Sequence, residues 1–167
     1  MGAPVTAARA RTAHVIIAST RASAGVYNDR TGPVIADWLA QRGFAPAQPE
    51  VVPDGEAVGA ALRAAVAAPV DLVITSGGTG ISPTDDTPAQ TAAVLDYEIP
   101  GLSDAIRRSG LPKVPTSVLS RGMCGVAGRT LIINLPGSTG GVRDGLGVLA
   151  DVLDHALDQL AGGDHER

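Results

Sequence analysis

The chain has 167 residues and a formal net charge of −4, and 44% of its residues are hydrophobic but only 2% aromatic. This length is that of one ordinary domain, whose core must be built from Val, Leu, Ile and Ala. The absence of a basic stripe and of a stacking surface argues against nucleic acid as a partner, and no apolar run approaches the roughly 20 residues of a membrane span. The single cysteine, Cys124, cannot form an internal disulfide and is typical of a reducing cytoplasm.

The first third of the chain predicts a strand, a polar loop and a helix. The apolar run over residues 14–18 predicts the strand. Residues 19–29 follow as a loop that is long enough to carry binding groups, and a solvated loop would show the same composition. Pro33 is expected at the first position of the helix, with apolar side chains at helical spacing behind it, and Gly43 ends it.

A second strand is predicted over residues 44–52, at an edge of the sheet, because Pro46 and Pro49 interrupt it. The next helix begins after Asp54, which occupies an N-cap position. Local evidence alone favours capping over catalysis for this carboxylate.

The stretch over residues 70–88 is the most informative part of the chain. It opens with a β-branched, apolar run that is typical of a strand buried on both faces. A glycine loop follows, in which the backbone can turn tightly and approach a ligand. Its small residues are Ser76, Gly77, Gly78, Thr79 and Gly80.

The helix after this loop is predicted to begin with Thr87 as N-cap, Pro88 at the first position and Gln90 completing a capping box. Amide N–H groups beside a helix N-terminus favour an anion, although a plain strand-to-helix turn would use the same glycines. Pro83 stands where a dinucleotide fingerprint needs its third glycine, so that motif is excluded.

The remaining chain predicts a helix over 87–97, a short helix over 98–109, a hairpin of 123–127 with 130–135, and a last helix over 142–160. Strands that alternate with helices predict an α/β fold with a mainly parallel sheet. In such sheets ligands lie beyond the carboxyl ends of the strands, so the loops 19–29, 76–86 and 136–141 are expected to meet at one cleft. A single domain is expected over 13–161, between a disordered tail over 1–12 and a C-terminal tail over 162–167.

The chemistry available is that of carboxylates beside a phosphate-binding loop. The three histidines are scattered, the only lysine lies far downstream, and Cys124 is expected to be a small core residue. Asp54, Asp85 and Asp86 remain, and carboxylates beside phosphate usually hold Mg²⁺. With Arg21 or Arg121 for a second anionic group, this set favours phosphoryl or nucleotidyl transfer without a covalent protein intermediate.

Six motifs, in order, resemble the MoaB/Mog family of molybdenum cofactor biosynthesis, which includes the G domain of gephyrin. The resemblance runs from about residue 14 to residue 160, and several ordered motifs are far more specific than a glycine loop alone. The motifs are SxR with GVYxD (19–29), PDxE (53–56), TSGGTG with DxTP (75–88), ExPG (98–101), LSR (119–121) and NLPGS (134–138).

The resemblance implies a molybdopterin adenylyltransferase, which transfers AMP from ATP to the terminal phosphate of molybdopterin with Mg²⁺ and releases pyrophosphate. By motif, Asp54 and Asp85 are the implied catalytic acids and metal ligands. The implied nucleotide-binding residues are Ser76, Gly77, Gly78, Thr79 and Gly80. The implied residues on the pterin and phosphate side are Ser19, Arg21, Arg121, Pro136, Gly137 and Ser138.

The resemblance also implies a three-layer α/β/α sandwich with a small antiparallel hairpin, a homotrimer or a hexamer of trimers, and a cytoplasmic location. Because no molybdenum-insertion domain is fused to the chain, a separate downstream molybdenum insertase is expected as a partner.

Two departures from the family pattern leave alternatives open. Thr84 stands where many members have arginine, and Asp86 stands where an apolar residue is common. Together they motivate a second reading, a non-catalytic paralogue that holds or delivers molybdopterin. A third reading is a nucleotide- or pterin-cleaving enzyme on the same fold, as in the related domain of competence-damage proteins.

Overall fold

The computed structural model describes residues 9–162, which form one six-stranded sheet between two layers of helices. The strands are β1 (Ala13–Ala18), β2 (Glu50–Val52), β3 (Leu72–Ser76), β4 (Tyr97–Glu98), β5 (Cys124–Ala127) and β6 (Thr130–Leu135). Their order is β2-β1-β3-β6-β5-β4. The first four strands in this order are mutually parallel, whereas β5 pairs antiparallel with both β6 and β4. The predicted α/β fold with a mainly parallel sheet and one antiparallel hairpin is confirmed.

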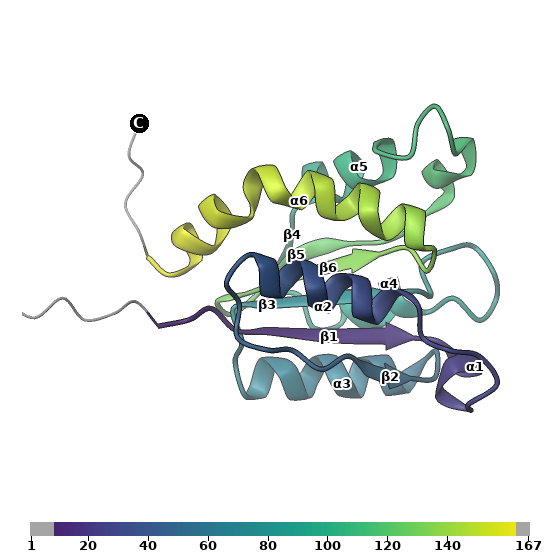
Figure 1. The fold of residues 1–167 in the computed structure, drawn as a ribbon, viewed down its shortest axis with the longest axis horizontal. Helices are drawn as coiled ribbons and strands as arrows, with labels where there is room; N and C mark the ends of the chain where they lie inside the picture. Colours follow the sequence, from purple (N-terminus) through teal and green to yellow (C-terminus); the bar gives the residue numbers. More distant parts are fainter. Residues whose placement is uncertain (1–8, 163–167) are drawn as a thin grey trace, which may run out of the picture.

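The helices cover both faces of the sheet (Figure 1). They are α1 (Thr20–Ser23), α2 (Thr31–Gln41), α3 (Glu56–Ala67), α4 (Thr87–Ala92), α5 (Pro100–Arg108), the 3₁₀ helix η1 (Pro115–Leu119) and α6 (Thr139–Leu160). Side chains alternate along β1: Val15 and Ile17 join the core under α2 and α6, while Ile16 packs toward α3. The central strands β3 and β6 are buried throughout, as their continuous apolar runs predict.

Two predicted elements are shorter than expected. The second strand covers only Glu50–Val52, at the sheet edge, because Pro46 and Pro49 cannot donate to a ladder. The helix predicted to reach residue 97 ends at Ala92. Tyr97 lies instead in β4, where it pairs with Val126, so sheet pairing overrides the local helical pattern.

The predicted helix starts are also corrected. Thr87 is the first residue of α4 and Asp86 is its N-cap, with no side-chain capping bond, so the capping box is wrong; Gln90 Nε2 donates to Asp86 Oδ2 at 2.8 Å. The N-cap of α3 is Gly55, with φ +98°, so Asp54 does not cap it. α2 begins at Thr31, two residues before Pro33.

Other predictions concern the loops and ends of the chain. The loop over 19–29 contains the short helix α1, and η1 follows the loop that begins at residue 110. None of the helices in the described range has both the length and the apolar composition needed to cross a bilayer. The predicted tails fall mostly outside residues 9–162.

Candidate functional site

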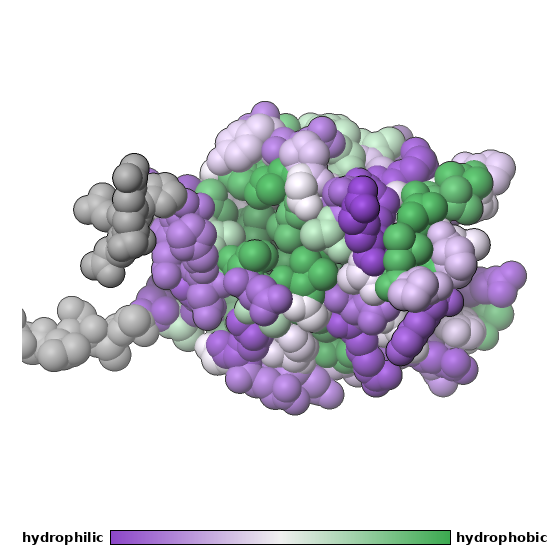
Figure 2. All heavy atoms as spheres, turned by 90° about the horizontal axis from the view of Figure 1, so that it is seen from above, coloured by the Kyte–Doolittle hydropathy of each residue, from purple (hydrophilic) through white to green (hydrophobic). Residues whose placement is uncertain are grey.

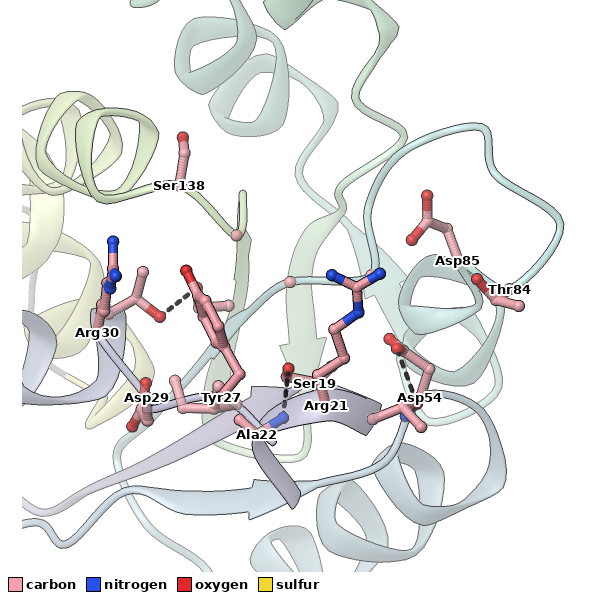
Figure 3. Close-up of a pocket in the computed structure, with 18 of the residues that line it drawn as sticks. Ser19, Arg21, Ala22, Tyr27, Asp29, Arg30, Asp54, Thr84, Asp85 and Ser138 are labelled. Carbon is pink, nitrogen blue, oxygen red and sulfur yellow. Dashed lines mark hydrogen bonds between the residues drawn. The ribbon is translucent and has the colours of Figure 1, made fainter. Parts of the chain in front are cut away.

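A cavity of about 730 Å³ opens at the carboxyl ends of the parallel strands (Figure 3). Segments far apart in the sequence meet there because parallel strands deliver their following loops to the same sheet edge. The three predicted loops converge at this cavity together with the turn that follows β2. Its lining residues are Ile17 to Ala22, Tyr27, Asp29 to Thr31, Asp54, Ser76 to Gly78, Thr84, Asp85 and Gly137 to Thr139.

The glycine loop after β3 forms one wall of the cavity and is held closely on all sides. Gly77 and Gly78 have φ of +98° and +68°, which favour glycine. A Cβ on Gly77 would collide with the main-chain oxygen of Ala18. A Cβ on Gly78 would collide with Thr87 Oγ1 and lie 2.9 Å from Asp54 Oδ1. Any residue other than glycine at these two positions would therefore clash with its neighbours.

Asp54 lies on one side of this loop, in the turn between β2 and α3. Its Oδ2 accepts a hydrogen bond from the Thr20 hydroxyl at 3.2 Å, and its N–H donates to the same hydroxyl oxygen, also at 3.2 Å. Ser19, the N-cap of α1, donates its N–H to Val52 O at 2.9 Å. These bonds tie α1 to the turn that carries the carboxylate.

Asp85 lies on the other side of the glycine loop. Its Oδ2 accepts from Ser82 N–H at 3.1 Å and would be 2.7 Å from a Cβ on Gly80. Arg121 closes the loop from outside the cavity: its Nε donates to Gly80 O at 3.0 Å and its Nη2 donates to Asp85 O at 2.8 Å. Two carboxylates thus border one glycine loop, each held by its own hydrogen bonds.

The far end of the cavity is formed by the start of α6 and α2. The Ser138 hydroxyl accepts from Gly141 N–H at 3.1 Å as the N-cap of α6, which leaves the hydroxyl proton available as a donor. Ser76 donates at this end, to Thr31 Oγ1 or to Pro136 O. The N-terminal ends of both helices therefore face the cavity, and their partial positive charge favours an anion there.

Comparison with known proteins decides the family. A model described as a probable molybdopterin binding domain matches residues 14–155. A solved structure of MogA is 74% identical, covers 90% of this chain and 99% of its own, and superposes with a TM-score of 0.89. The Mog protein of Mycobacterium ulcerans is 71% identical with the same TM-score, over 93% and 99% of the two chains. The chain belongs to the MogA/MoaB molybdopterin-binding family.

More distant members of the family differ in length and in their names. The molybdopterin adenylyltransferase of Escherichia coli is 37% identical over 135 residues, which are 77% of this chain and 68% of that protein. The chain spans only about half of the bifunctional molybdenum cofactor protein of Synechococcus elongatus, at 36% identity. A protein CinA of Thermoplasma acidophilum, at 20% identity and a TM-score of 0.66, shares the fold alone.

Most residues that the MogA/MoaB motifs imply for the site lie around the cavity, and four do not. Those that line it are Ser19, Arg21, Asp54, Ser76, Gly77, Gly78, Asp85, Gly137 and Ser138. Thr79 and Gly80 continue the glycine loop behind the lining, and Pro136 lies behind Gly137. Arg121, instead of facing the cavity, has its guanidinium on main-chain oxygens of the loop.

Sequence reasoning missed several lining residues. Thr20 separates the two motif residues Ser19 and Arg21, and only its contact with Asp54 reveals it. Tyr27 stood in a motif without an assigned role, and the Arg30 guanidinium lies 5.2 Å from its ring centroid, at the end of the cavity near Ser138 (Figure 3). Neither helical spacing nor the order of motifs predicts which loop residues contact one another in the folded chain.

Acidic side chains in the cavity lining outnumber basic ones by one. Asp29, Asp54 and Asp85 face Arg21 and Arg30. Within residues 9–162, the cavity included, no three His, Cys, Asp or Glu side chains gather into a metal site, so any ion there would depend on two carboxylates and on ligands from the substrate. Cys124 lies apart from the cavity in β5, and burial raises the pKa of its thiol to about 12, which confirms its place in the core.

Proposed function

We propose that this chain transfers AMP from ATP to the terminal phosphate of molybdopterin and releases pyrophosphate. The observation that carries the proposal is one cavity in which a glycine-rich loop lies between two carboxylates, Asp54 and Asp85. The 74% identity to a MogA structure and the adenylyltransferase relatives support the same reaction.

The reaction needs positioning rather than proton transfer. A phosphate oxygen of molybdopterin attacks the α-phosphorus of ATP, a new P–O bond forms, and the bond from that phosphorus to the β-phosphate bridging oxygen breaks. The electron pair leaves with pyrophosphate. A phosphate monoester carries about 1.5 to 2 negative charges at pH 7, so the nucleophile needs no general base. The cavity lining accordingly contains no histidine, and its residues act by holding groups in line and offsetting charge.

The triphosphate is proposed to lie against the glycine loop, where Gly78 lines the cavity and Thr79 and Gly80 follow directly behind it. Among residues 9–162, the main-chain N–H groups of these three residues have no hydrogen-bond partner, so they are available to phosphate oxygens. Gly77 has a different role, because its N–H donates to Leu135 O at 3.1 Å and fixes the loop to β6.

The donor set fits Mg²⁺, which takes one or two carboxylates together with phosphate oxygens and waters. Asp54 Oδ1 and Asp85 Oδ2 both lie against the glycine loop, within 3 Å of where a Cβ on Gly78 and on Gly80 would stand. We propose these two carboxylates as the residues that hold the ion beside the phosphates. Bound there, Mg²⁺ would neutralise charge on the triphosphate and its leaving group.

The pterin and its phosphate are proposed to occupy the other lining residues, Ser19, Arg21, Gly137 and Ser138. Arg21 supplies a fixed positive charge and Ser138 a hydroxyl donor at a helix N-terminus. Pro136 and Arg121 are proposed to act from behind the lining, by shaping the loops that carry Ser138 and Asp85.

Mass detection of the product tests the reaction directly. The protein is incubated with ATP, Mg²⁺ and molybdopterin, and adenylyl-molybdopterin with an equal amount of pyrophosphate is expected. Pyrophosphate released without molybdopterin would point instead to the cleaving enzyme, and adenylylated product missing in every condition would contradict the transferase.

A second candidate is a non-catalytic protein that binds or delivers molybdopterin. Thr84 favours it, because this residue lines the cavity where many relatives are expected to have arginine, and the lining acids outnumber the bases. Calorimetry distinguishes the two: the transferase binds ATP with Mg²⁺, whereas the carrier binds the pterin and ignores the nucleotide.

We also propose a cytoplasmic homotrimer, or a hexamer of trimers, that passes its product to a separate molybdenum insertase. Figure 2 shows an apolar area on the face seen from above Figure 1, where α5 and α6 lie. On α6, the side chain of Val152 is 40% exposed. Leu102, Val148 and Ala156 are only partly buried against the core that α2 and α6 cover. Light scattering gives the copy number, and a monomer would contradict this part of the proposal.

A further inference from the structure

Thr87 has a buried hydroxyl without a hydrogen-bond partner. The residue is fully buried, and its Oγ1 is one of only two buried side-chain atoms left unpaired within residues 9–162. Leaving such a group unpaired costs about 1–3 kcal/mol, and a native structure that keeps one calls for an explanation. Stability does not explain it, because valine would fill the same space without the polar atom.

This hydroxyl lies beside the glycine loop. Thr87 is the first residue of α4, and its N–H donates to Gly78 O at 3.2 Å. A Cβ placed on Gly78 would collide with Thr87 Oγ1 and would lie 2.9 Å from Asp54 Oδ1. The hydroxyl and the carboxylate oxygen therefore lie on the same side of Gly78, within a few ångströms of each other.

Asp54 holds this position with one oxygen only. Its Oδ2 is bound by the Thr20 hydroxyl at 3.2 Å, while Oδ1 faces the glycine loop. The carboxylate points toward the part of the cavity that Arg21 and Asp85 border (Figure 3). Because Oδ1 and the unpaired hydroxyl both lie within 3 Å of the same Cβ position on Gly78, reorientation of the carboxylate can bring the two together. A hydrogen bond to an ionised carboxylate is among the stronger ones in proteins.

We propose that Thr87 is a positioning residue for Asp54: its hydroxyl donates to Asp54 Oδ1 when ATP occupies the glycine loop, and thereby fixes the carboxylate between two threonines. This inference rests on the proposed function. The hydroxyl is uncommitted in the free protein because its acceptor takes up its final orientation only with the nucleotide in place. Thr87 touches neither substrate and acts through Asp54.

Two substitutions separate the hydroxyl from the shape of the side chain. Thr87→Val keeps the volume and removes the unpaired oxygen, so the melting temperature is expected to rise by about 2–4 °C. AMP transfer and the affinity for ATP with Mg²⁺ are expected to fall about ten- to a hundredfold, as for a lost bond to a charged group. Thr87→Ser keeps the hydroxyl, loses a buried methyl group, and is expected to melt earlier with near wild-type transfer.

Thr91 is the matched control. It lies one turn further along α4 and is equally buried, but its hydroxyl accepts from Asn134 Nδ2 at 3.0 Å. Thr91→Val is therefore expected to lower the melting temperature and to leave ATP affinity unchanged. A gain in stability together with a loss of binding, at position 87 alone, is a pattern that a structural threonine does not produce.

A double variant identifies the acceptor. If Thr87 acts through Asp54, Thr87→Val weakens ATP binding in the wild type but has no further effect in an Asp54→Ala background, which has no acceptor at this position. Additive losses would overturn the inference, as would a Thr87→Val protein that melts earlier or binds ATP as tightly as the wild type. Failure of the proposed function looks different: a wild type that binds ATP but makes no product contradicts the reaction alone, and Thr87 is then judged by the ATP titration. A wild type that does not bind ATP overturns both the proposed function and this inference.

Discussion

Each end of the sheet has a hollow, and the two hollows differ in whether the polar groups around them have hydrogen-bond partners. At the carboxyl end, the cavity of about 730 Å³ borders the glycine loop. Within residues 9–162, the N–H groups of Gly78 to Gly80 in this loop and the neighbouring Thr87 hydroxyl have no hydrogen-bond partner. At the amino end, a hollow of about 530 Å³ lies between Val66, Asp71, Gly128 and Leu160. The difference between them lies in hydrogen bonding rather than in volume.

Three polar side chains that line the hollow at the amino end, Arg9, Asp71 and Thr130, are hydrogen-bonded to neighbouring groups. Asp71 accepts from Thr12 N–H at 2.8 Å and from Arg9 at 3.3 Å, and Thr130 donates to Val70 O at 2.7 Å. These bonds join the segment before β1 and the start of β6 to the two residues that precede β3. Few polar groups there remain available to bind a ligand. The comparison shows that the candidate site lies where the fold leaves hydrogen-bond donors unpaired beside two carboxylates, and that cavity volume alone would not reveal this.

Asp85→Asn is expected to have the largest effect. Asparagine is a weaker ligand for the proposed Mg²⁺ ion, whose charge would offset that of the transition state, so AMP transfer should fall by at least about a hundredfold. The melting temperature should change little, because Oδ2 needs only to accept from Ser82. Asp86→Asn is the control: this neighbour lies outside the cavity lining and bonds to Gln90. Equal losses in the two variants would contradict the assignment.

Gly78→Ala should reduce both activity and stability. The new methyl group would collide with Thr87 Oγ1 and press on Asp54 Oδ1, at a φ of +68° that disfavours alanine. A loss of about 2 kcal/mol or more in unfolding free energy is expected, together with weak ATP binding by calorimetry. Gly128→Ala at the amino end also has positive φ, +61°, but open space around it. The Gly128→Ala variant should lose less stability than Gly78→Ala and bind ATP as the wild type does. Weakened ATP binding in Gly128→Ala would contradict the assignment of the site to the carboxyl end of the sheet.

Asp71→Asn should affect stability alone. The amide keeps the volume but weakens the bonds to Thr12 and Arg9, so chemical denaturation should show a loss of about 1 kcal/mol. AMP transfer measured below the melting temperature should equal that of the wild type. A change in the affinity for ATP would show that the amino end takes part in the site.

The smallest expected effect is on the pH dependence of stability and comes from Cys124, which lies in neither hollow. At neutral pH this effect is absent. The pKa of the thiol is 9.0 unfolded and about 12 when folded, so the unfolded chain releases its proton first. Stability from this group is complete below pH 9 and is lost as pH rises from about 9 to about 12, at about 1.4 kcal/mol per pH unit. Denaturation of the wild type and Cys124→Ala between pH 8 and 10 checks this, and parallel pH profiles would contradict the raised pKa.

The sequence was most informative where one physical demand dominated. Apolar runs predicted β1, β3 and β6, because strands buried on both faces need them. The hairpin at Gly128 and the convergence of three loops followed from turn chemistry and sheet topology. Ordered motifs placed Asp54 and Asp85 at one cavity, although each alone had a plainer explanation.

The misses occur where contacts between distant segments override local preference. Tyr97 joins β4 through pairing with Val126, which no local pattern contains. Thr87 looked like a cap and is instead a helical residue with an unpaired hydroxyl. Arg121 looked like an anion ligand, but its guanidinium is engaged by Gly80 and Asp85 carbonyls. Such contacts depend on the folded backbone and not on spacing.

The most direct test of the account is a crystal structure with a non-hydrolysable ATP analogue and Mg²⁺. The account predicts phosphate density against the amides of Gly78 to Gly80, with a cation between the Asp54 and Asp85 carboxylates. An empty glycine loop with both carboxylates turned to solvent, or nucleotide bound elsewhere on the molecule, would contradict it.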